Sequence, residues 1–329
     1  MNAEQLAERF LDVSPWKGRG WSDLALDNMF QHRAHDCLLL RVSFSGTEVQ
    51  ISAGELGAHQ YFPALLDFFR MVQEYFPIQG NILVSLLDGA PGDISSSVPI
   101  LSFSKPASDE NPLLIPDPYY LSNFGYRDNF ATIDRLLAEI PRAQRLPVAY
   151  WRGSSTGVPT ITGDTWRENP RVKLCLLAKH FPELLSAKIT RVVQAGANSV
   201  ANELDFQSIS AEWEPMTNNL LYRYGIDIDG NCCAWGFFQK MYMDLAILKV
   251  KSDWMQWYYP LLEDGVHIIS VDASLENLQE SLLRLRADEA LGDRIAANAH
   301  DLARELDYAQ AVIYTGCLLS RVFEWKTAG

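Results

Sequence analysis

A run of small residues lies between an extended-looking segment, 224–229, and a helical one, 237–243. It consists of Gly230, Asn231, Cys232, Cys233, Ala234, Trp235 and Gly236 and leads into Phe237. Small residues in a loop that enters a helix let a diphosphate approach backbone N–H groups at the positive end of the helix dipole. The segment therefore predicts a site for an anion, with a simple turn as the alternative.

A second polar segment follows an expected strand at 146–151. After Trp151 it contains Arg152, Gly153, Ser154, Ser155, Thr156 and Gly157. Arginine can bind two phosphate oxygens at once, and hydroxyls with a flexible backbone can complete such a site. The segment is not a Walker loop, which requires GxxxxGK[ST]. A surface turn with a structural arginine is the alternative.

Asp88 is the carboxylate whose position suits a general base, because it ends the apolar segment 81–87. In α/β proteins, ligands bind beyond the carboxyl ends of parallel strands, where a carboxylate could take a proton. A turn-forming role is the alternative for a lone aspartate at that place. Asp227 and Asp229 could suggest a metal site, but their alternation equally fits a strand that leads into a turn. We predict no metal and no other cofactor.

Alternating helices and strands must position these segments. We expect strands at 81–87, 99–103, 146–151, 187–193, 246–250 and 266–271, and helices at 65–76, 133–140, 169–180, 233–243 and from 274 onward. Such alternation is typical of doubly wound α/β sheets. We expect two domains, 1–145 and 146–304, with a C-terminal helix at 305–329 that packs back on the first.

The composition narrows the classes of function. The chain has 329 residues, of which 48% are hydrophobic and 21% charged, as in globular proteins. A net charge of −13 disfavours nucleic acid as a partner. The apolar runs are shorter than the roughly 20 residues of a membrane span, and the N-terminal residues do not resemble a signal peptide. These features predict a cytoplasmic protein, with peripheral contact at the inner face of the membrane left open.

At these segments the chain resembles glycosyltransferase family 90, which includes Rumi-type protein O-glucosyltransferases, fungal capsule xylosyltransferases and bacterial lipopolysaccharide-modifying enzymes. The resemblance extends over most of the chain from about residue 81 to about 300. It is carried by LVSLLD, VPILSFSK, YWRGSSTG, YRYGIDIDGN, LAILKV, WYYPLLEDGVHIISV and ASLENLQESL. Several segments in the same order are more specific than any one of them.

The resemblance implies a GT-B fold, in which two Rossmann-like domains face each other across a cleft. It implies an inverting, metal-independent transferase that takes a sugar from a UDP-sugar. Asp88 occupies the position of the family's catalytic base. The family's contacts to uridine diphosphate correspond here to residues 152–156 and 231–237.

The chain also departs from the family pattern. Rumi-type enzymes have an arginine where Gly236 stands, and Lys240, one helical turn later, is a candidate substitute. They also have an arginine where Leu87 stands. These departures leave open whether the donor carries glucose, xylose or galactose. They also keep open a catalytically silent module that binds a nucleotide sugar or a glycan.

The acceptor side is expected within the irregular segment 106–129, which is rich in Pro, Asp, Asn and Tyr. We expect Asp117, Tyr119 and Arg127 to contact the acceptor there. A lipopolysaccharide or another surface glycan is the preferred acceptor, because the chain lacks the secretory signal and paired cysteines of the animal enzymes. A protein O-glycosyltransferase is the alternative.

Overall fold

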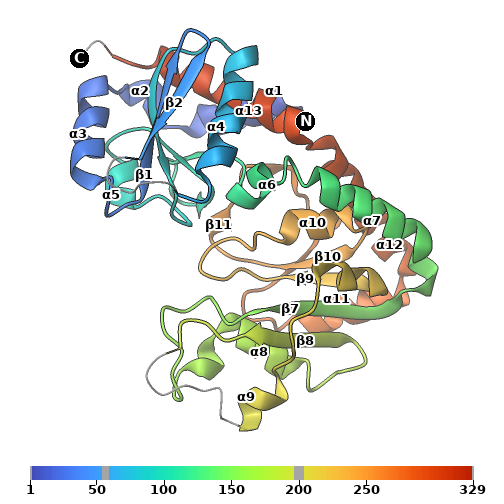
Figure 1. Ribbon diagram of the computed structural model, residues 1–329. Helices are drawn as coiled ribbons and strands as arrows, with labels where there is room; N and C mark the ends of the chain where they lie inside the picture. Colours follow the sequence, from blue (N-terminus) through green and yellow to red (C-terminus); the bar gives the residue numbers. More distant parts are fainter. Residues whose placement is uncertain (1, 54–58, 196–203, 328–329) are drawn as a thin grey trace. The chain divides into compact units, whose positions relative to one another are not determined.

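The computed structural model describes residues 2–53, 59–195 and 204–327 (Figure 1). Contacts divide the chain into two units. The first contains Met1–Arg127, Asp253–Leu261 and Glu305–Gly329, and the second contains Asp128–Ser252 and Leu262–Arg304. The chain therefore changes unit four times, and each unit is described separately below.

The main boundary lies at Arg127 rather than at the expected 145. Helix α7 (Arg127–Glu139) follows this boundary and packs on α10 (Phe237–Tyr242) of the second unit. The ring of Phe130 stacks on that of Tyr242 with centroids 3.6 Å apart. The Tyr242 hydroxyl also donates a hydrogen bond of 3.1 Å to Asp134. Tertiary packing, which the local sequence does not reveal, thus assigns α7 to the second unit.

The first unit contains most of the N-terminal helices and one mixed sheet. Its helices are α1 (Ala3–Val13), α2 (Trp16–Arg19), α3 (Asp23–Arg33), α4 (Phe62–Tyr75), α5 (Gly92–Ser95), α6 (Pro118–Ser122) and α13 (Tyr308–Glu324). Its strands are β1 (Leu39–Ser45), β2 (Glu48–Ser52), β3 (Gly80–Ser85), β4 (Ile100–Ser102), β5 (Lys105–Pro106), β6 (Leu113–Leu114) and β11 (Trp254–Met255).

The five-stranded sheet of this unit has the order β2-β1-β3-β4-β6. Strands β3, β4 and β6 are parallel, whereas β1 is antiparallel to both of its neighbours. The expected Rossmann-like half is therefore limited to the β3–β6 side, and the β1–β2 hairpin, which was not predicted, extends the sheet. The pair β5 and β11 forms a separate small sheet.

The C-terminal helix α13 packs against α1 and α4 in the first unit (Figure 1). Helix α1 begins with a capping box, in which Asn2 and Gln5 each accept a hydrogen bond from the other's backbone N–H. Phe10 of α1 contacts Tyr314 of α13 edge to face, with centroids 6.1 Å apart. The two ends of the chain are thus part of one apolar core.

The second unit is built on a parallel sheet. Its strands are β7 (Leu146–Ser154), β8 (Leu185–Arg191), β9 (Tyr222–Asp227), β10 (Ala246–Val250) and β12 (Ile269–Val271). Besides α7 and α10, its helices are α8 (Pro170–Leu177), α9 (Leu204–Ser208), α11 (Leu278–Ala287) and α12 (Glu289–Glu305). This parallel sheet and the partly parallel sheet of the first unit confirm the expected α/β class.

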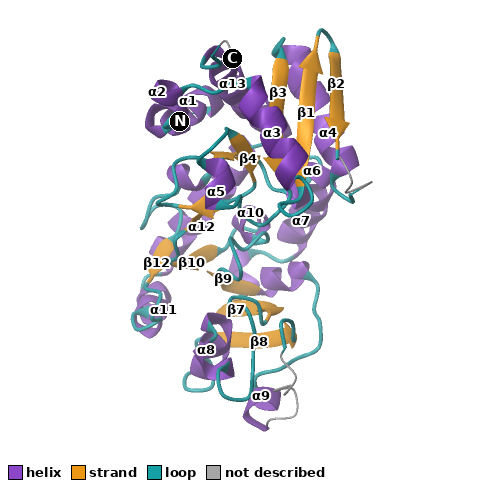
Figure 2. Ribbon diagram, turned by 90° about the vertical axis from the view of Figure 1, so that its left-hand side faces the viewer, coloured by secondary structure: helices purple, strands orange, loops and turns teal. Residues whose placement is uncertain are grey.

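The order of this sheet is β12-β10-β9-β7-β8, and all pairings are parallel (Figure 2). Along the chain, β7 and β9 are the first and third strands, so the order corresponds to 2-1-3-4-5 of doubly wound proteins. The chain winds to one side of β7 and then to the other. The switch point lies between β7 and β9, and ligands of such sheets bind at the carboxyl ends of these strands.

A buried apolar core supports this sheet. All five residues of β10 are buried, as expected for a central parallel strand that is covered on both faces. Core side chains come from three helices as well, including Val172 of α8, Leu282 of α11 and Ile295 of α12. The ends of β7 and β9 are thus held on a rigid scaffold.

Candidate functional site

Asp88 lies in the turn that follows β3, and its side chain is exposed. Serines of the following strand support this turn. Ser104 donates its hydroxyl to the carbonyl oxygen of Asp88, and Ser102 accepts a hydrogen bond of 3.1 Å from the N–H of Ala90. The carboxylate is therefore accessible to a ligand while its backbone is held in place.

The turn is also packed against a distant segment of the chain. A Cβ atom on Gly89 would lie 2.7 Å from the ring of Trp254, so a glycine is needed for this close approach. Trp254 belongs to β11, within the segment Asp253–Leu261 that joins the first unit. No local pattern in the sequence indicates this contact between residues so far apart.

Two tyrosines accompany Asp88 in the first unit. Tyr61 contacts Tyr119 edge to face, with centroids 6.2 Å apart, and lies 6.4 Å from the ring of Phe103. Burial, the hydrogen bond with Tyr119 and the charge of Asp88 together raise the pKa of Tyr61 to about 12. Tyr61 therefore stays protonated at neutral pH. Asp88 and the predicted Tyr119 thus belong to one group, to which Tyr61 must be added.

The other predicted acceptor residues have different surroundings. Asp117 is buried and caps α6, accepting hydrogen bonds of 3.0 Å from the N–H groups of Tyr119 and Tyr120. Burial raises its pKa to about 7. The expected contact of Asp117 with an acceptor is therefore replaced by a structural role. Arg127 is exposed, with its guanidinium 5.8 Å from the ring centroid of Phe124.

In the second unit, the two predicted donor segments meet at the switch point. One begins in the last residues of β7 and the other follows β9, and a hydrogen bond joins them directly. The N–H of Gly157 donates to Asn231 Oδ1 at 3.2 Å. Asn169, which caps α8, donates to the carbonyl oxygens of Ser155 at 2.8 Å and Thr156 at 3.2 Å. We call residues 154–157 and 228–231 the two switch-point loops.

Arg171 of α8 connects both switch-point loops. On the β7 side, Nη1 donates to the Ser154 carbonyl at 3.1 Å and to Thr156 Oγ1 at 2.6 Å. On the β9 side, Nε and Nη2 donate to the carbonyl oxygens of Asp229 and Ile228, both at 3.1 Å. The sequence patterns did not single out Arg171. The available signal was its place after Asn-Pro at the start of a helix, which brings its side chain near strand ends.

Arg152 lies in a different contact network from the one expected. Its Nε donates to Glu214 at 2.9 Å, its Nη1 donates to the Ser186 carbonyl at 3.0 Å, and its guanidinium lies 4.3 Å from the ring centroid of Tyr150. Within the described residues Nη2 has no partner, so this nitrogen remains for a ligand. Hydrogen bonds from Tyr150, Asn218 and Arg152 lower the pKa of Glu214 to about 2. Glu214 was also not predicted.

A cavity of about 340 Å³ lies beside Arg152. Its walls include Ser154, Arg191 and Glu214, together with Trp213, which is 75% exposed. The cavity thus combines an open aromatic face with cationic and hydroxyl groups. These are the groups that bind a flat ring and phosphate oxygens.

The structure corrects several predicted donor contacts. The Ser155 hydroxyl is buried and donates to the Val193 carbonyl at 3.0 Å, so it holds β7 to the chain after β8. Lys240 is buried and donates to the Ile226 carbonyl at 2.7 Å, with Asp227 at 3.4 Å. It therefore cannot replace the missing arginine at Gly236 as expected.

The loop before α10 differs from the prediction in a second way. Helix α10 begins at Phe237 rather than at 233 and has six residues, so its dipole is short. The side chains of Cys232, Cys233 and Phe237 are buried, which leaves their backbone as the part that can face a ligand. Ala234 donates its N–H to Asp229 at 2.9 Å. Trp235 and Gly236 are half-buried.

Asp227 and Asp229 are surrounded by lysines. Asp227 is fully buried and forms ion pairs with Lys249 at 2.9 Å and with Lys240 at 3.4 Å. Burial opposes its ionisation, but the two lysines prevail and hold the pKa of Asp227 below its usual value. Within the described residues, no cluster of three His, Cys, Asp or Glu side chains suited to a metal is found.

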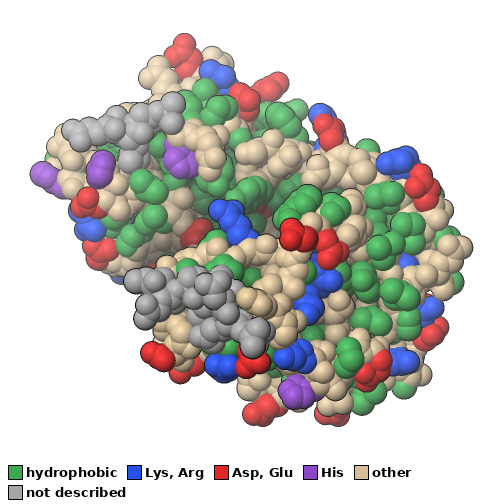
Figure 3. All heavy atoms as spheres, turned by 60° about the horizontal axis from the view of Figure 1, so that its bottom comes forward, with side chains coloured by type: hydrophobic (Ala, Val, Ile, Leu, Met, Phe, Trp, Pro, Cys, Tyr) green, Lys and Arg blue, Asp and Glu red, His purple; other side chains and the backbone are tan. Residues whose placement is uncertain are grey.

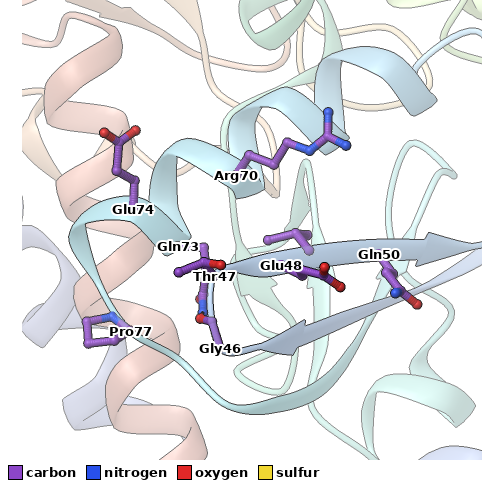
Figure 4. Close-up of a pocket in the computed structure, with 9 residues that line it drawn as sticks. Gly46, Thr47, Glu48, Gln50, Arg70, Gln73, Glu74 and Pro77 are labelled. Atoms are coloured by element: carbon purple, nitrogen blue, oxygen red, sulfur yellow. The ribbon is translucent and has the colours of Figure 1, made fainter.

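A larger cavity, of about 790 Å³, lies in the first unit between α4 and the β1–β2 hairpin (Figure 4). None of the predicted site residues lines it. Its buried amide, Gln73, donates to the Ile78 carbonyl at 3.0 Å and to the Gly46 carbonyl. Gln73 therefore holds the hairpin in place rather than serving a ligand.

Two surface features bear on partners. On the face drawn in Figure 3, basic and acidic side chains are interspersed among the residues the structure describes. Over the same described residues, no helix has both the length and the apolar character required to cross a membrane.

The sequence is similar to those of several known proteins. The chain is 24% identical over 226 residues to human Protein O-glucosyltransferase 1, covering 65% of this chain and 54% of the relative. It is 30% identical over 213 residues to Uncharacterized protein 179R of Invertebrate iridescent virus 6, covering 56% of this chain and 17% of that protein. The chain thus spans about half the length, or less, of these relatives.

A solved structure of Anabaena Alr3699/HepE in complex with UDP and glucose is similar to 79% of this chain and 76% of its own, at 13% identity and a TM-score of 0.42. The family model described as Glycosyl transferase family 90 matches residues 94–322, well over half of the chain. That match includes both switch-point loops. The chain belongs to glycosyl transferase family 90.

Proposed function

We propose that this chain transfers a sugar from a UDP-sugar to an acceptor hydroxyl, by inversion and without a metal. The observation that carries the proposal is the meeting of the two switch-point loops at the carboxyl ends of β7 and β9. Doubly wound sheets bind nucleotides at this place. In this proposal the second unit holds the donor and the first unit the acceptor, as the two halves of a GT-B transferase.

Asp88 acts in this proposal as the general base. It takes the proton from the acceptor hydroxyl while that oxygen forms a bond to the anomeric carbon from the face opposite the diphosphate. The bond from the anomeric carbon to the diphosphate oxygen breaks, and the electron pair leaves with UDP. One base is sufficient for such a single displacement.

Stabilisation of the departing diphosphate requires fixed donors. In the second unit, the available groups are Arg152 Nη2, the Ser154 and Thr156 hydroxyls and the backbone of residues 231–236. Each preorganised donor in a site of this kind lowers the activation barrier by on the order of 3 kcal/mol. The proposed reaction therefore needs no divalent ion to neutralise the leaving group.

For the acceptor we propose a sugar hydroxyl of a lipopolysaccharide or another surface glycan. The aromatic rings of Tyr61 and Tyr119 that accompany Asp88 suit the apolar face of a sugar. The names of the curated relatives favour a protein hydroxyl as the competing acceptor and glucose as the sugar. Transfer to glycan fragments and to serine-containing peptides, compared side by side, separates the two acceptors.

The donor is tested by calorimetry with UDP, UDP-glucose, UDP-xylose, UDP-galactose and an adenine dinucleotide, each with and without EDTA. We expect binding of UDP and of one or more UDP-sugars that EDTA does not change. Loss of binding with EDTA would refute the metal-free site. Absence of any uridine-nucleotide binding would refute the proposed function.

Replacement of the base is the sharper test of the reaction. Asp88→Asn keeps the size of an exposed side chain, so we expect unchanged UDP affinity and a transfer rate lower by about 10²- to 10⁴-fold. A normal rate in Asp88→Asn would show that another group is the base.

A catalytically silent module that binds a nucleotide sugar is the second candidate. It is favoured by Gly236 at the position of the Rumi-type arginine and by Lys240 being engaged with Asp227. Slow hydrolysis of the donor without acceptor discriminates between the two. An active transferase releases UDP at a low rate that Asp88→Asn lowers further, whereas a silent module releases none.

A further inference from the structure

Arg171 is a half-buried cation whose hydrogen-bond acceptors carry no full charge. All of its hydrogen bonds go to backbone carbonyl oxygens or to the hydroxyls of Ser154 and Thr156. Among the described residues no carboxylate lies within ion-pair distance of its guanidinium. A half-buried guanidinium without an ion pair can take an anionic ligand as its counter-ion.

The groups behind the two switch-point loops share this excess of positive charge. Asp227 and Asp229 are buried, and so are Lys240 and Lys249, which form ion pairs with them. With Arg171, three cations face two carboxylates.

The excess charge lies close to the place where a diphosphate is expected. Arg171 holds Thr156 on one loop and Asp229 on the other, so the two loops keep a fixed spacing. A Cβ atom on Gly230 would lie only 3.0 Å from Arg171 Nη2. The Gly230 backbone therefore lies close to the guanidinium and leaves little room for a side chain at this position.

We propose that Arg171 is the positioning residue for the donor's diphosphate, holding the two switch-point loops at their spacing and supplying the positive charge that attracts the phosphates. This inference rests on the proposed function. It explains how the chain binds a diphosphate although Gly236 replaces an arginine and Lys240 is engaged with Asp227. Arg171 acts through the loops, and the ligand it serves is a nucleoside diphosphate.

The test compares the affinities of UDP, UMP and uridine by calorimetry in the wild type, Arg171→Gln and Arg171→Lys. If Arg171 supplies the positive charge that attracts the phosphates, Arg171→Gln should weaken UDP binding by about 10- to 150-fold. This factor corresponds to the loss of hydrogen bonds from a charged group. Uridine affinity should change little, because uridine carries no phosphate. Arg171→Lys should restore part of the preference for UDP over uridine.

An equal loss for UDP and uridine in Arg171→Gln would show that Arg171 only maintains the fold and would overturn the inference, while the proposed function would stand. Failure of the wild type to bind UDP would overturn both. If Arg171→Gln does not fold, the variant Asp229→Asn tests the same inference. It keeps an oxygen to accept the Ala234 N–H and removes a negative charge, so the preference for UDP should increase. An unchanged or lower preference would contradict the inference.

Discussion

Replacement of Gly230 by alanine tests whether the spacing of the two switch-point loops determines affinity for the donor. A Cβ atom at this position would overlap Thr156 Oγ1 and would lie 3.0 Å from Arg171 Nη2. Thr156 cannot rotate away without losing its hydrogen bond of 2.6 Å from Arg171. The methyl group must therefore push the loops apart.

The expected size of the effect follows from overpacking. Extra methyl groups in tightly packed sites destabilise by about 1–3 kcal/mol. If the ligand requires the original spacing, the same free energy is lost from binding, which weakens UDP affinity by about 5- to 150-fold. Calorimetry with UDP measures this change. Circular dichroism would show that the fold is kept, because the backbone of Gly230 needs no left-handed conformation.

Two further variants make the test specific. Gly18→Ala adds a methyl group where no atom lies within 4 Å, so UDP affinity should stay as in the wild type. Adding Thr156→Ala to Gly230→Ala removes the overlapping hydroxyl, so the double variant should lose less affinity than the sum of the losses in the two single variants. Wild-type affinity in Gly230→Ala would refute the claim that the loop spacing is set by this contact.

Two other predictions concern buried carboxylates. Burial raises the pKa of Asp117 from 3.8 to about 7 in the folded protein, so the folded state favours the protonated carboxyl group. The resulting stabilisation of the folded protein is fully present below about pH 4 and is lost as the pH rises through 7. The loss amounts to about 4 kcal/mol at about 1.4 kcal/mol per pKa unit. Asp117→Asn retains a capping oxygen and should be more stable than the wild type at pH 8 but not at pH 4, as measured by urea unfolding. Asp227→Asn leaves Lys240 and Lys249 without their main counter-ion and should reduce the free energy of unfolding by about 3–5 kcal/mol.

Each of these predictions has a control. Glu139→Gln breaks an exposed ion pair with Arg135, and the free energy of unfolding should change by less than about 1 kcal/mol. Asp227→Asn with no greater effect than Glu139→Gln would contradict the assigned burial of the charges. For Asp117, the same pH dependence of stability in the wild type and in Asp117→Asn would show that another group is responsible.

Local patterns were sufficient for most elements that carry the donor segments. The apolar runs at 146–151 and 246–250 correspond to β7 and β10 because buried parallel strands read as mostly apolar segments, and the extended-looking segment 224–229 overlaps β9. The helix expected at 169–180 corresponds to α8, whose start is marked by Asn169 and Pro170. The hairpin β1–β2 was not predicted, although apolar and polar residues alternate along both of its strands as they do in half-buried strands.

The sequence by itself determined the α/β class, the strand-end position of Asp88 and the two polar segments, because each depends on residue types within a few positions. Only the tertiary structure decided which charges are free for a ligand. Lys240 was expected to face the diphosphate, yet Asp227 binds it, and Arg152 shares its guanidinium with Glu214. Arg171 joins loops that lie more than 70 residues apart along the chain. Whether a charged side chain forms an ion pair within the protein depends on groups that the fold brings together from distant positions in the chain. The local sequence does not show which of these groups come into contact.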